Sequence, residues 1–228
     1  MSSDSAFVLG GVPATNMNVR HRIQFLVGDA GQEDAVGRAV DAAADNGRLD
    51  IAVANAGTGS LAPIQETKDS EWQRVLQTNL GGTFYLIKSA AGYMADGGSI
   101  CAISSIAGVR THRFMSAYCT SKAAIEMLVR NSADELGVKG IRVNSVCPGL
   151  VETDLAAGLL TTEAVYKDYR RCMPLNRHGQ PEDIAKAVRF LCGPESTWIT
   201  GVSLSVDGGH HLRRGPELDP IVDAIYAQ

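Results

Sequence analysis

The alternation of short apolar segments with longer amphipathic ones is the feature of this chain that most restricts its fold. The short segments are 23–27, 50–54, 99–103, 141–147 and 202–206. Apolar residues recur at helical spacing in the longer segments 32–46, 67–80, 116–136 and 181–191. Segment 50–54 has no polar face, which is typical of a parallel strand buried on both sides. The pattern predicts an α/β fold with one doubly wound parallel sheet between helices.

Size and charge narrow the class of protein. The chain has 228 residues, enough for one well-buried α/β domain, and a net charge of −4, without the basic excess of a nucleic-acid binder. It contains no long apolar run and does not begin like a signal peptide, so we expect a cytoplasmic protein with no membrane partner. The five cysteines include no Cys-x-x-Cys pair, which indicates free thiols and no metal site.

Polar and glycine-containing motifs follow three of the predicted strands. They are Asn55-Ala56-Gly57, then Ser104-Ser105, then Pro148-Gly149 with Thr153 a few residues later. Ligands of open parallel sheets bind beyond the carboxyl ends of the strands. These motifs are therefore the first candidates for a binding site.

Tyr118 and Lys122 are the residues best suited to acid–base chemistry. They lie four residues apart in a predicted helix, which places their side chains on one face, roughly 5–6 Å apart at Cβ. A neighbouring ammonium favours the phenolate, so we expect Lys122 to lower the pKa of Tyr118 toward a range useful in catalysis. A tyrosine and a lysine at this spacing are common by chance. The pair indicates a catalytic site only when the motifs around it do so as well.

Taken together, these motifs resemble the short-chain dehydrogenase/reductase family, whose fold is Rossmann-like. The resemblance covers about residues 25–209 and has its motifs in the same order. They are an Asn-Ala-Gly triplet after a strand, an asparagine in the next helix (Asn79), a serine thirteen residues before the tyrosine (Ser105), Tyr-x-x-x-Lys, and Pro-Gly followed by a threonine (Thr153). The resemblance implies an NAD- or NADP-dependent oxidoreductase that interconverts a secondary alcohol and a ketone.

The resemblance also implies a role for each residue. Tyr118 would act as general acid or base, Ser105 would hold the substrate oxygen, and Lys122 would contact the nicotinamide ribose. Asn79 would hold a water connected to the lysine, and Thr153 would bind the carboxamide. The catalytic set is then Asn79, Ser105, Tyr118 and Lys122. The cofactor-binding set is Asp29, Asn55, Ala56, Gly57, Tyr118, Lys122, Pro148, Gly149 and Thr153.

Several of these residues have a structural interpretation as well. Ser104 or Ser105 could merely terminate a strand, and the interval to Tyr118 selects Ser105 for catalysis and leaves Ser104 as a turn residue. Asn79 could be satisfied by local backbone inside its helix. Asn55 is expected to tie strand ends together. Asp29 is either a simple turn residue or the aspartate that the family places near the adenine.

The beginning of the chain departs from the family pattern. The family starts with a βαβαβ half whose glycine-rich turn holds the pyrophosphate, and we expect this chain to be truncated there, because residues 1–22 cannot contain such a half. Phe7-Val-Leu-Gly-Gly11 is at most a remnant of the first strand and its turn. We therefore expect three parts: an atypical segment 1–22, a family-like domain 23–209, and a tail 210–228 that serves as an interface.

This departure leaves two classes of function open. One is an active dehydrogenase with a compensating cofactor site. The other is a catalytically impaired binding or assembly protein that keeps the fold. Apolar residues between Thr153 and Gln180 suggest a hydrophobic or alicyclic substrate, although they could equally be core residues. The resemblance further implies a homodimer or homotetramer.

Overall fold

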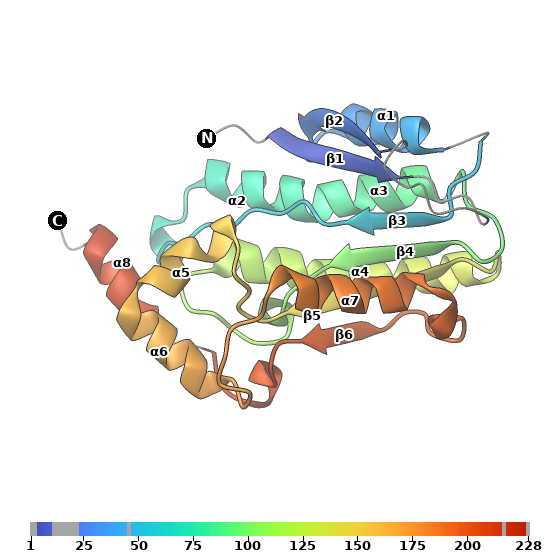
Figure 1. The fold of residues 1–228 in the computed structure, drawn as a ribbon. Helices are drawn as coiled ribbons and strands as arrows, with labels where there is room; N and C mark the ends of the chain where they lie inside the picture. The colour runs from blue at the N-terminus through green and yellow to red at the C-terminus, as the bar shows by residue number, and fades with distance from the viewer. Residues whose placement is uncertain (1–3, 11–22, 45–46, 216–217, 227–228) are drawn as a thin grey trace.

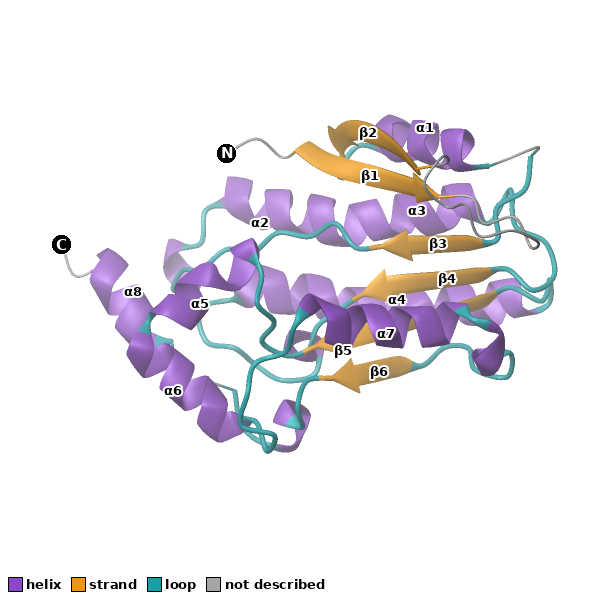
Figure 2. Cartoon of the chain, viewed as in Figure 1, coloured by secondary structure: helices purple, strands orange, loops and turns teal. Residues whose placement is uncertain are grey.

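The computed structural model describes residues 4–10, 23–44, 47–215 and 218–226. Helices and strands alternate along them (Figures 1 and 2). In chain order the elements are β1 (Asp4–Gly10), β2 (Ile23–Asp29), α1 (Glu33–Ala43), β3 (Ile51–Ala54), α2 (Asp69–Leu76), α3 (Gly82–Ala90), β4 (Ser99–Ile103), α4 (Ser116–Gly137), β5 (Arg142–Pro148), α5 (Ala157–Thr161), α6 (Glu163–Cys172), α7 (Pro181–Cys192), β6 (Ser203–Val206) and α8 (Asp219–Tyr226). No helix in this described part is long and apolar enough to cross a membrane.

A four-stranded parallel sheet forms the centre of the molecule, with the strand order β3-β4-β5-β6. Alternate residues of β4 face opposite sides of the sheet. Ile100 and Ala102 pack against α3 and α4, whereas Cys101 packs against Leu191 of α7. The sheet therefore has helices on both faces, which confirms the predicted α/β fold (Figure 1).

The first predicted strand does not join this sheet. Segment 23–27 was expected to be parallel to the others, but β2 instead pairs antiparallel with β1 in a separate two-stranded sheet. The partner β1 includes most of the segment that we interpreted as a remnant of the first strand. Figure 1 shows these two strands beside α1, outside the parallel sheet. Local apolar pattern indicated the strand correctly but could not indicate its partner.

The prediction that segment 50–54 is buried on both faces is wrong. In β3, Ala52 is buried, but Ile51 and Val53 are 49% and 40% exposed. Helix α3 contacts β3 on one face, whereas α7 lies over β4, β5 and β6. Among the described residues no helix covers the other face of β3, and its two large side chains are open to a cavity.

Helix ends also differ in detail from the sequence prediction. Thr67 begins the predicted segment 67–80 and is of a residue type that often caps a helix, but Lys68 is the N-cap of α2 and the Thr67 hydroxyl donates to the Pro63 carbonyl. α1 ends at Ala43, before the end of the predicted segment 32–46. Gly82, at the start of α3, allows a close approach to the turn between β2 and α1, because a Cβ there would lie 2.7 Å from the Ala30 oxygen.

The tail after β6 packs on its own chain rather than standing free. His210 is fully buried, and Arg214 bonds Asp168 of α6 through both terminal nitrogens, at 2.9 and 2.5 Å. Leu218, at the start of the last helical segment, is also fully buried, against α6. The proposed role of this tail as an interface between subunits stays a prediction.

Candidate active site

A cavity of about 970 Å³ opens at the carboxyl ends of β3, β4 and β5. Eight of the predicted site residues line it: Asn55, Gly57, Ser105, Tyr118, Lys122, Pro148, Gly149 and Thr153. Three do not, namely Asp29, Ala56 and Asn79. Residues from segments far apart in the sequence thus meet where open parallel sheets bind their ligands.

Tyr118 and Ser105 lie together in this cavity. Ser105 is the second residue after β4, and Tyr118 lies in the first turn of α4. The Ser105 hydroxyl is close enough to the Tyr118 phenol to influence its pKa. Tyr118 opens on the cavity and is only half-buried. Even so, burial raises the pKa of its phenol, and the Ser105 hydroxyl opposes that rise.

Lys122 lies below Tyr118 on the same face of α4. It is 3% exposed, and its Nζ lies 5.6 Å from the centre of the tyrosine ring and donates to the Ile103 carbonyl at 2.7 Å. Burial lowers the pKa of this ammonium to about 8. The expectation that Lys122 lowers the tyrosine pKa does not hold in this structure. Burial of both groups outweighs the attraction, since desolvation disfavours each charged form.

Asn79 links two parts of the site without reaching the cavity. It lies in a π-helical turn, Gln77–Gly81, between α2 and α3 and is fully buried. Its Oδ1 accepts from Thr58 N at 2.8 Å, and its Nδ2 donates to the Thr58 carbonyl and to Ser121 Oγ, both at 2.9 Å. Its own carbonyl accepts from Thr83 Oγ1 at 2.7 Å. The side chain therefore ties the loop after β3 to α4.

Two glycines of that loop bring bare backbone close to the reactive side chains. A Cβ on Gly57 would lie 3.6 Å from Lys122 Nζ, and one on Gly59 would lie 3.8 Å from the Tyr118 ring. A Cβ at either position would be in ordinary van der Waals contact with the tyrosine or the lysine. The backbone of the loop therefore lies directly beside both side chains.

Arg74 of α2 also fixes this loop, although the pattern of the sequence did not indicate it. Its guanidinium donates to Thr58 Oγ1 at 2.6 Å and to the Gly59 carbonyl at 3.0 Å. It is held in turn by Glu71, at 2.8 and 3.1 Å. These contacts join residues 15 and 16 positions apart. Local pattern cannot reveal them.

The other predicted residues have mainly local roles. Ser104 bonds the Lys122 carbonyl and Glu126 Oε1, as expected of a structural residue. Thr153 caps the 3₁₀ turn before α5, where its hydroxyl accepts from Ala156 N. The Asp29 carboxylate accepts from Gly31 N at 2.8 Å. The structure therefore favours the turn interpretation of Asp29.

Most of the cavity wall is apolar and comes from residues outside the predicted set. Ile51 and Val53 of β3 and Ile184 and Val188 of α7 line one part. The part on the side of α5 and α8 is lined by Leu61, Met115, Leu150, Leu155, Leu159 and Ile221. Of these, Leu155 and Leu159 belong to the segment 153–180 that suggested a hydrophobic substrate.

Comparison with known proteins agrees with this geometry. The profile of the family described as Enoyl-(Acyl carrier protein) reductase matches residues 13–211. A cis-4-hydroxycyclohexanecarboxylate dehydrogenase from Sinomonas cyclohexanicum is 37% identical over 83% of this chain and 77% of its own. A 7alpha-hydroxysteroid dehydrogenase from Escherichia coli is 39% identical over 72% of this chain and 64% of its own.

Solved structures complete the comparison. A short-chain type dehydrogenase/reductase from Mycobacterium ulcerans superimposes with a TM-score of 0.84 and 40% identity, over 88% of this chain and 74% of that one. The chain belongs to the short-chain dehydrogenase/reductase family. BdcA in complex with NADPH superimposes with a TM-score of 0.74 and 33% identity, over 83% of this chain and 75% of that one. This family of oxidoreductases works with NAD or NADP, and the chain has its Rossmann-like fold.

Proposed function

We propose that this short-chain dehydrogenase/reductase interconverts a secondary alcohol and a ketone, with Tyr118 as general acid and base. The observation that carries the proposal is that the side chains of Tyr118 and Ser105 meet inside the large cavity. Two hydroxyls at one point of an apolar cavity are suited to hold and protonate a carbonyl oxygen. The relatives named above are dehydrogenases of ring alcohols, which supports the same reaction class and a hydrophobic or alicyclic substrate.

In this proposal each side chain has one task. Ser105 donates a hydrogen bond to the substrate oxygen, and Tyr118 gives it a proton during reduction or takes one during oxidation. Lys122 lies beneath the tyrosine ring, and its task is to contact the nicotinamide ribose. Asn79 and Arg74 hold the loop that forms the wall opposite the tyrosine ring.

The donor set beside Tyr118 fits the nicotinamide half of an NAD or NADP cofactor. Gly57 and Gly59 present backbone without side chains beside Tyr118, Lys122 offers an ammonium for ribose hydroxyls, and Thr153 offers a hydroxyl in the same cavity. When bound, the cofactor supplies or accepts the hydride. Asn55, Pro148 and Gly149 line the same space and would enclose it.

The first test is cofactor binding followed by a single substitution. Titration with NADH and with NADPH, read by nicotinamide fluorescence, is expected to show saturation with at least one of them. Tyr118→Phe is expected to lower kcat by a factor of about 10² or more while cofactor affinity stays the same, because only the proton donor is removed.

Tyr93→Phe is the matched control, since the Tyr93 hydroxyl bonds Asp41 at the surface, away from the cavity. Failure of both cofactors to bind at millimolar concentration would contradict the enzyme assignment for this chain. If Tyr118→Phe turned over as fast as the wild type, another group would have to be the acid.

One observation favours the second candidate, a catalytically impaired binding or assembly protein. The cavity wall beyond Lys122 is apolar at Ile51, Val53, Ile184 and Val188, and Arg189 is the cationic side chain beside them, so this part offers few donors to a charged pyrophosphate. Sedimentation velocity tests this candidate, because a protein that stays monomeric at micromolar concentration cannot be an assembly protein. The five free cysteines support a reducing compartment such as the cytoplasm.

A further inference from the structure

Helix α8 forms part of the cavity wall next to the reactive tyrosine. Ile221 of this helix lines the cavity, together with Leu61, Met115, Leu155 and Leu159 from three other segments. Figure 1 shows α8 and α5 beyond the ends of the strands, whereas α7 lies over the sheet itself. The cavity therefore has one end at α5 and α8 and another along β3 and α7. Tyr118 opens on the same cavity.

The chain holds α8 firmly in this place. Leu218 and Val222 are 0% and 4% exposed, and Leu218 packs with Leu150, Val165 and Tyr169. Val222 follows Leu218 by four residues and so lies on the same face of the helical segment. At its first turn, Asp219 forms an ion pair with Arg113. These contacts fix the position of Ile221.

Arg113 connects α8 to the segment that leads into Tyr118. Its guanidinium lies over the Phe114 ring, 4.7 Å from the ring centre. Phe114 has a φ of 68°, a left-handed conformation that is strained for a bulky residue. Its carbonyl accepts from Ala62 N at 2.9 Å, which joins it to the loop that carries Leu61. The strained residue is thus held between α8 and two cavity-lining neighbours, Leu61 and Met115.

The end of the cavity at α5 and α8 is apolar, because its lining side chains are aliphatic or thioether. The Asp219 carboxylate at the start of α8 is paired with Arg113, and Asp154 and Asp223 are exposed. A carboxylate placed among the aliphatic side chains would lose its hydration without gaining a partner.

We propose that α8 is the specificity wall of the site, that Ile221 limits the size of the substrate, and that the substrate carries a neutral apolar ring or chain at this end. This inference rests on the proposed alcohol and ketone chemistry and narrows it. It separates this chain from a relative whose name gives it a carboxylate substrate. Ile221 determines specificity by filling space and takes no part in proton or hydride transfer.

The charge part is tested with two ketones of the same ring. The wild-type protein is given 4-oxocyclohexanecarboxylate and its methyl ester, with whichever of NADH and NADPH binds. The ester is expected to have a kcat/KM at least about tenfold higher, the scale on which apolar pockets discriminate. Equal values, or a preference for the carboxylate, would overturn the assignment of a neutral substrate.

The size part is tested by substitution in α8. Ile221→Trp is expected to lower kcat/KM for a bicyclic ketone such as 2-decalone by about tenfold or more, with a much smaller effect on cyclohexanone. Ile221→Ala is expected to shift the ratio of the two values in the opposite direction. Ile225→Trp is the control, because Ile225 lies one turn further along the same helix, is 54% exposed and does not line the cavity. If Ile225→Trp changed the ratio as much as Ile221→Trp, the specificity wall would be disproved.

A binding measurement separates failure of this inference from failure of the proposed function. Calorimetric titration of 2-decalone without cofactor should show binding to the wild type and to Ile225→Trp and weaker binding to Ile221→Trp. Absence of turnover with this binding pattern would contradict the dehydrogenase and support the specificity wall. Turnover of 2-decalone together with equal binding by all three proteins would support the dehydrogenase and contradict the specificity wall.

Discussion

Arg74 shows how a residue outside the reactive set can decide the geometry of this site. It bonds Thr58 and Gly59 on one side and Glu71 on the other, so the loop beside Tyr118 is held by a charged group from α2. Charge-assisted bonds of this kind are shorter and stronger than neutral ones. The loop also depends on Asn79, whose Oδ1 accepts a hydrogen bond from the Thr58 amide.

We therefore expect Arg74→Gln to lower kcat/KM by about ten- to a hundredfold, because small displacements near reacting atoms have effects of this size. The melting temperature should fall only slightly, since the side chain is 39% exposed. Steady-state kinetics and differential scanning fluorimetry measure both quantities. Arg130→Gln, on α4, is the control. A large loss of melting temperature with unchanged kinetics would mean that Arg74 only stabilises the fold.

At this scale the sequence located the reactive residues better than their surroundings. Ser105 was distinguished from Ser104 by its distance along the chain from Tyr118, and the structure brings Ser105 to the tyrosine and Ser104 to Lys122 and Glu126. Arg74 and Ile221 could not be found in this way. Their positions follow from tertiary contacts between segments, and a single sequence contains no record of such contacts.

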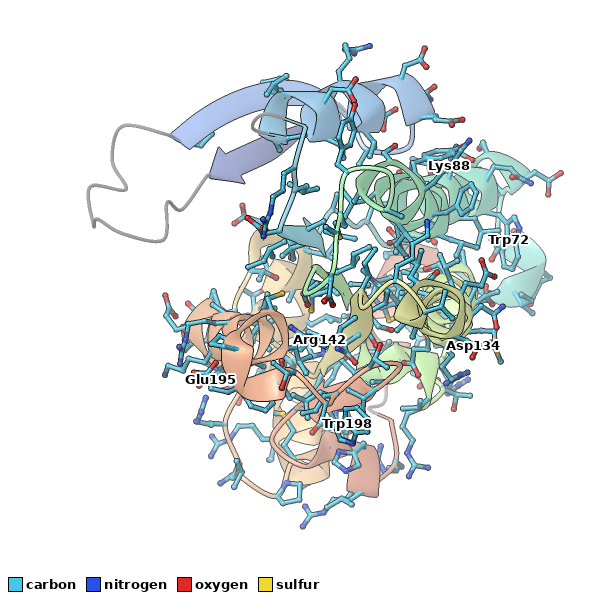
Figure 3. All side chains as sticks on the ribbon, turned by 90° about the vertical axis from the view of Figure 1, so that its right-hand side faces the viewer. Trp72, Lys88, Asp134, Arg142, Glu195 and Trp198 are labelled. Carbon is cyan, nitrogen blue, oxygen red and sulfur yellow. The ribbon has the colours of Figure 1, made fainter. Side chains whose placement is uncertain are left out.

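Helix α7 is attached to the sheet by one buried guanidinium. Arg142 of β5 is 9% exposed and donates to the Leu191 carbonyl at 2.6 Å and to Ser196 Oγ at 2.8 Å. It also reaches the carbonyls of Cys192 and Gly193, at 3.4 and 3.3 Å, and so satisfies the end of the helix. Figure 3 shows Arg142 in the interior and Trp198 nearby. Trp198 is almost fully exposed.

Arg142→Ala is expected to lower the free energy of unfolding by about 2–3 kcal/mol, because it removes several buried hydrogen bonds of a charged donor at the end of α7. Urea denaturation followed by circular dichroism measures this quantity. Arg189→Ala is a suitable comparison, since its side chain is 77% exposed and its partner Glu195 lies 3.9 Å away. Equal effects of the two substitutions would show that the buried bonds add nothing.

Secondary structure was easier to predict than the surroundings of each element. Helices α4 and α7 and strands β4, β5 and β6 lie within a residue or two of the predicted segments. The environment of β3 and the pairing of β2 were wrong, because an apolar segment shows that burial is favourable but not which element provides it. A helix cap such as Thr67 also fails when another local hydrogen bond competes for the hydroxyl.

For the whole molecule, buried histidines couple stability to pH. His112 and His210 are 7% and 0% exposed, and their rings contact each other and Tyr169. His210 Nε2 faces the Arg214 carbonyl and therefore carries the proton, which leaves its buried Nδ1 without a hydrogen-bond partner among the described residues. Burial lowers the pKa of both imidazoles.

The folded state therefore binds these protons less readily than the unfolded state, whose histidines titrate near 6.5. Stability is complete above that pH and falls as the pH drops below it, by up to about 1.4 kcal/mol per pH unit for each histidine. Urea unfolding at several pH values between 7.5 and 5 measures the slope. His210→Phe should reduce it. A slope unaffected by His210→Phe would assign the pH dependence to other groups.

The order of the strands in the parallel sheet has a consequence for how the protein is made. β3, β4, β5 and β6 lie side by side in the same order in which they occur along the chain. Each strand that emerges from the ribosome can therefore pair with the strand synthesised before it, at the edge of a sheet that already exists. No strand of this sheet depends for its first pairing on a strand that is skipped in the sequence. Contacts close in sequence form fast. A nascent chain that ends after β5 would already contain three of these four strands, together with α3 and α4 to cover one face. The residues of α8 would not yet have been synthesised.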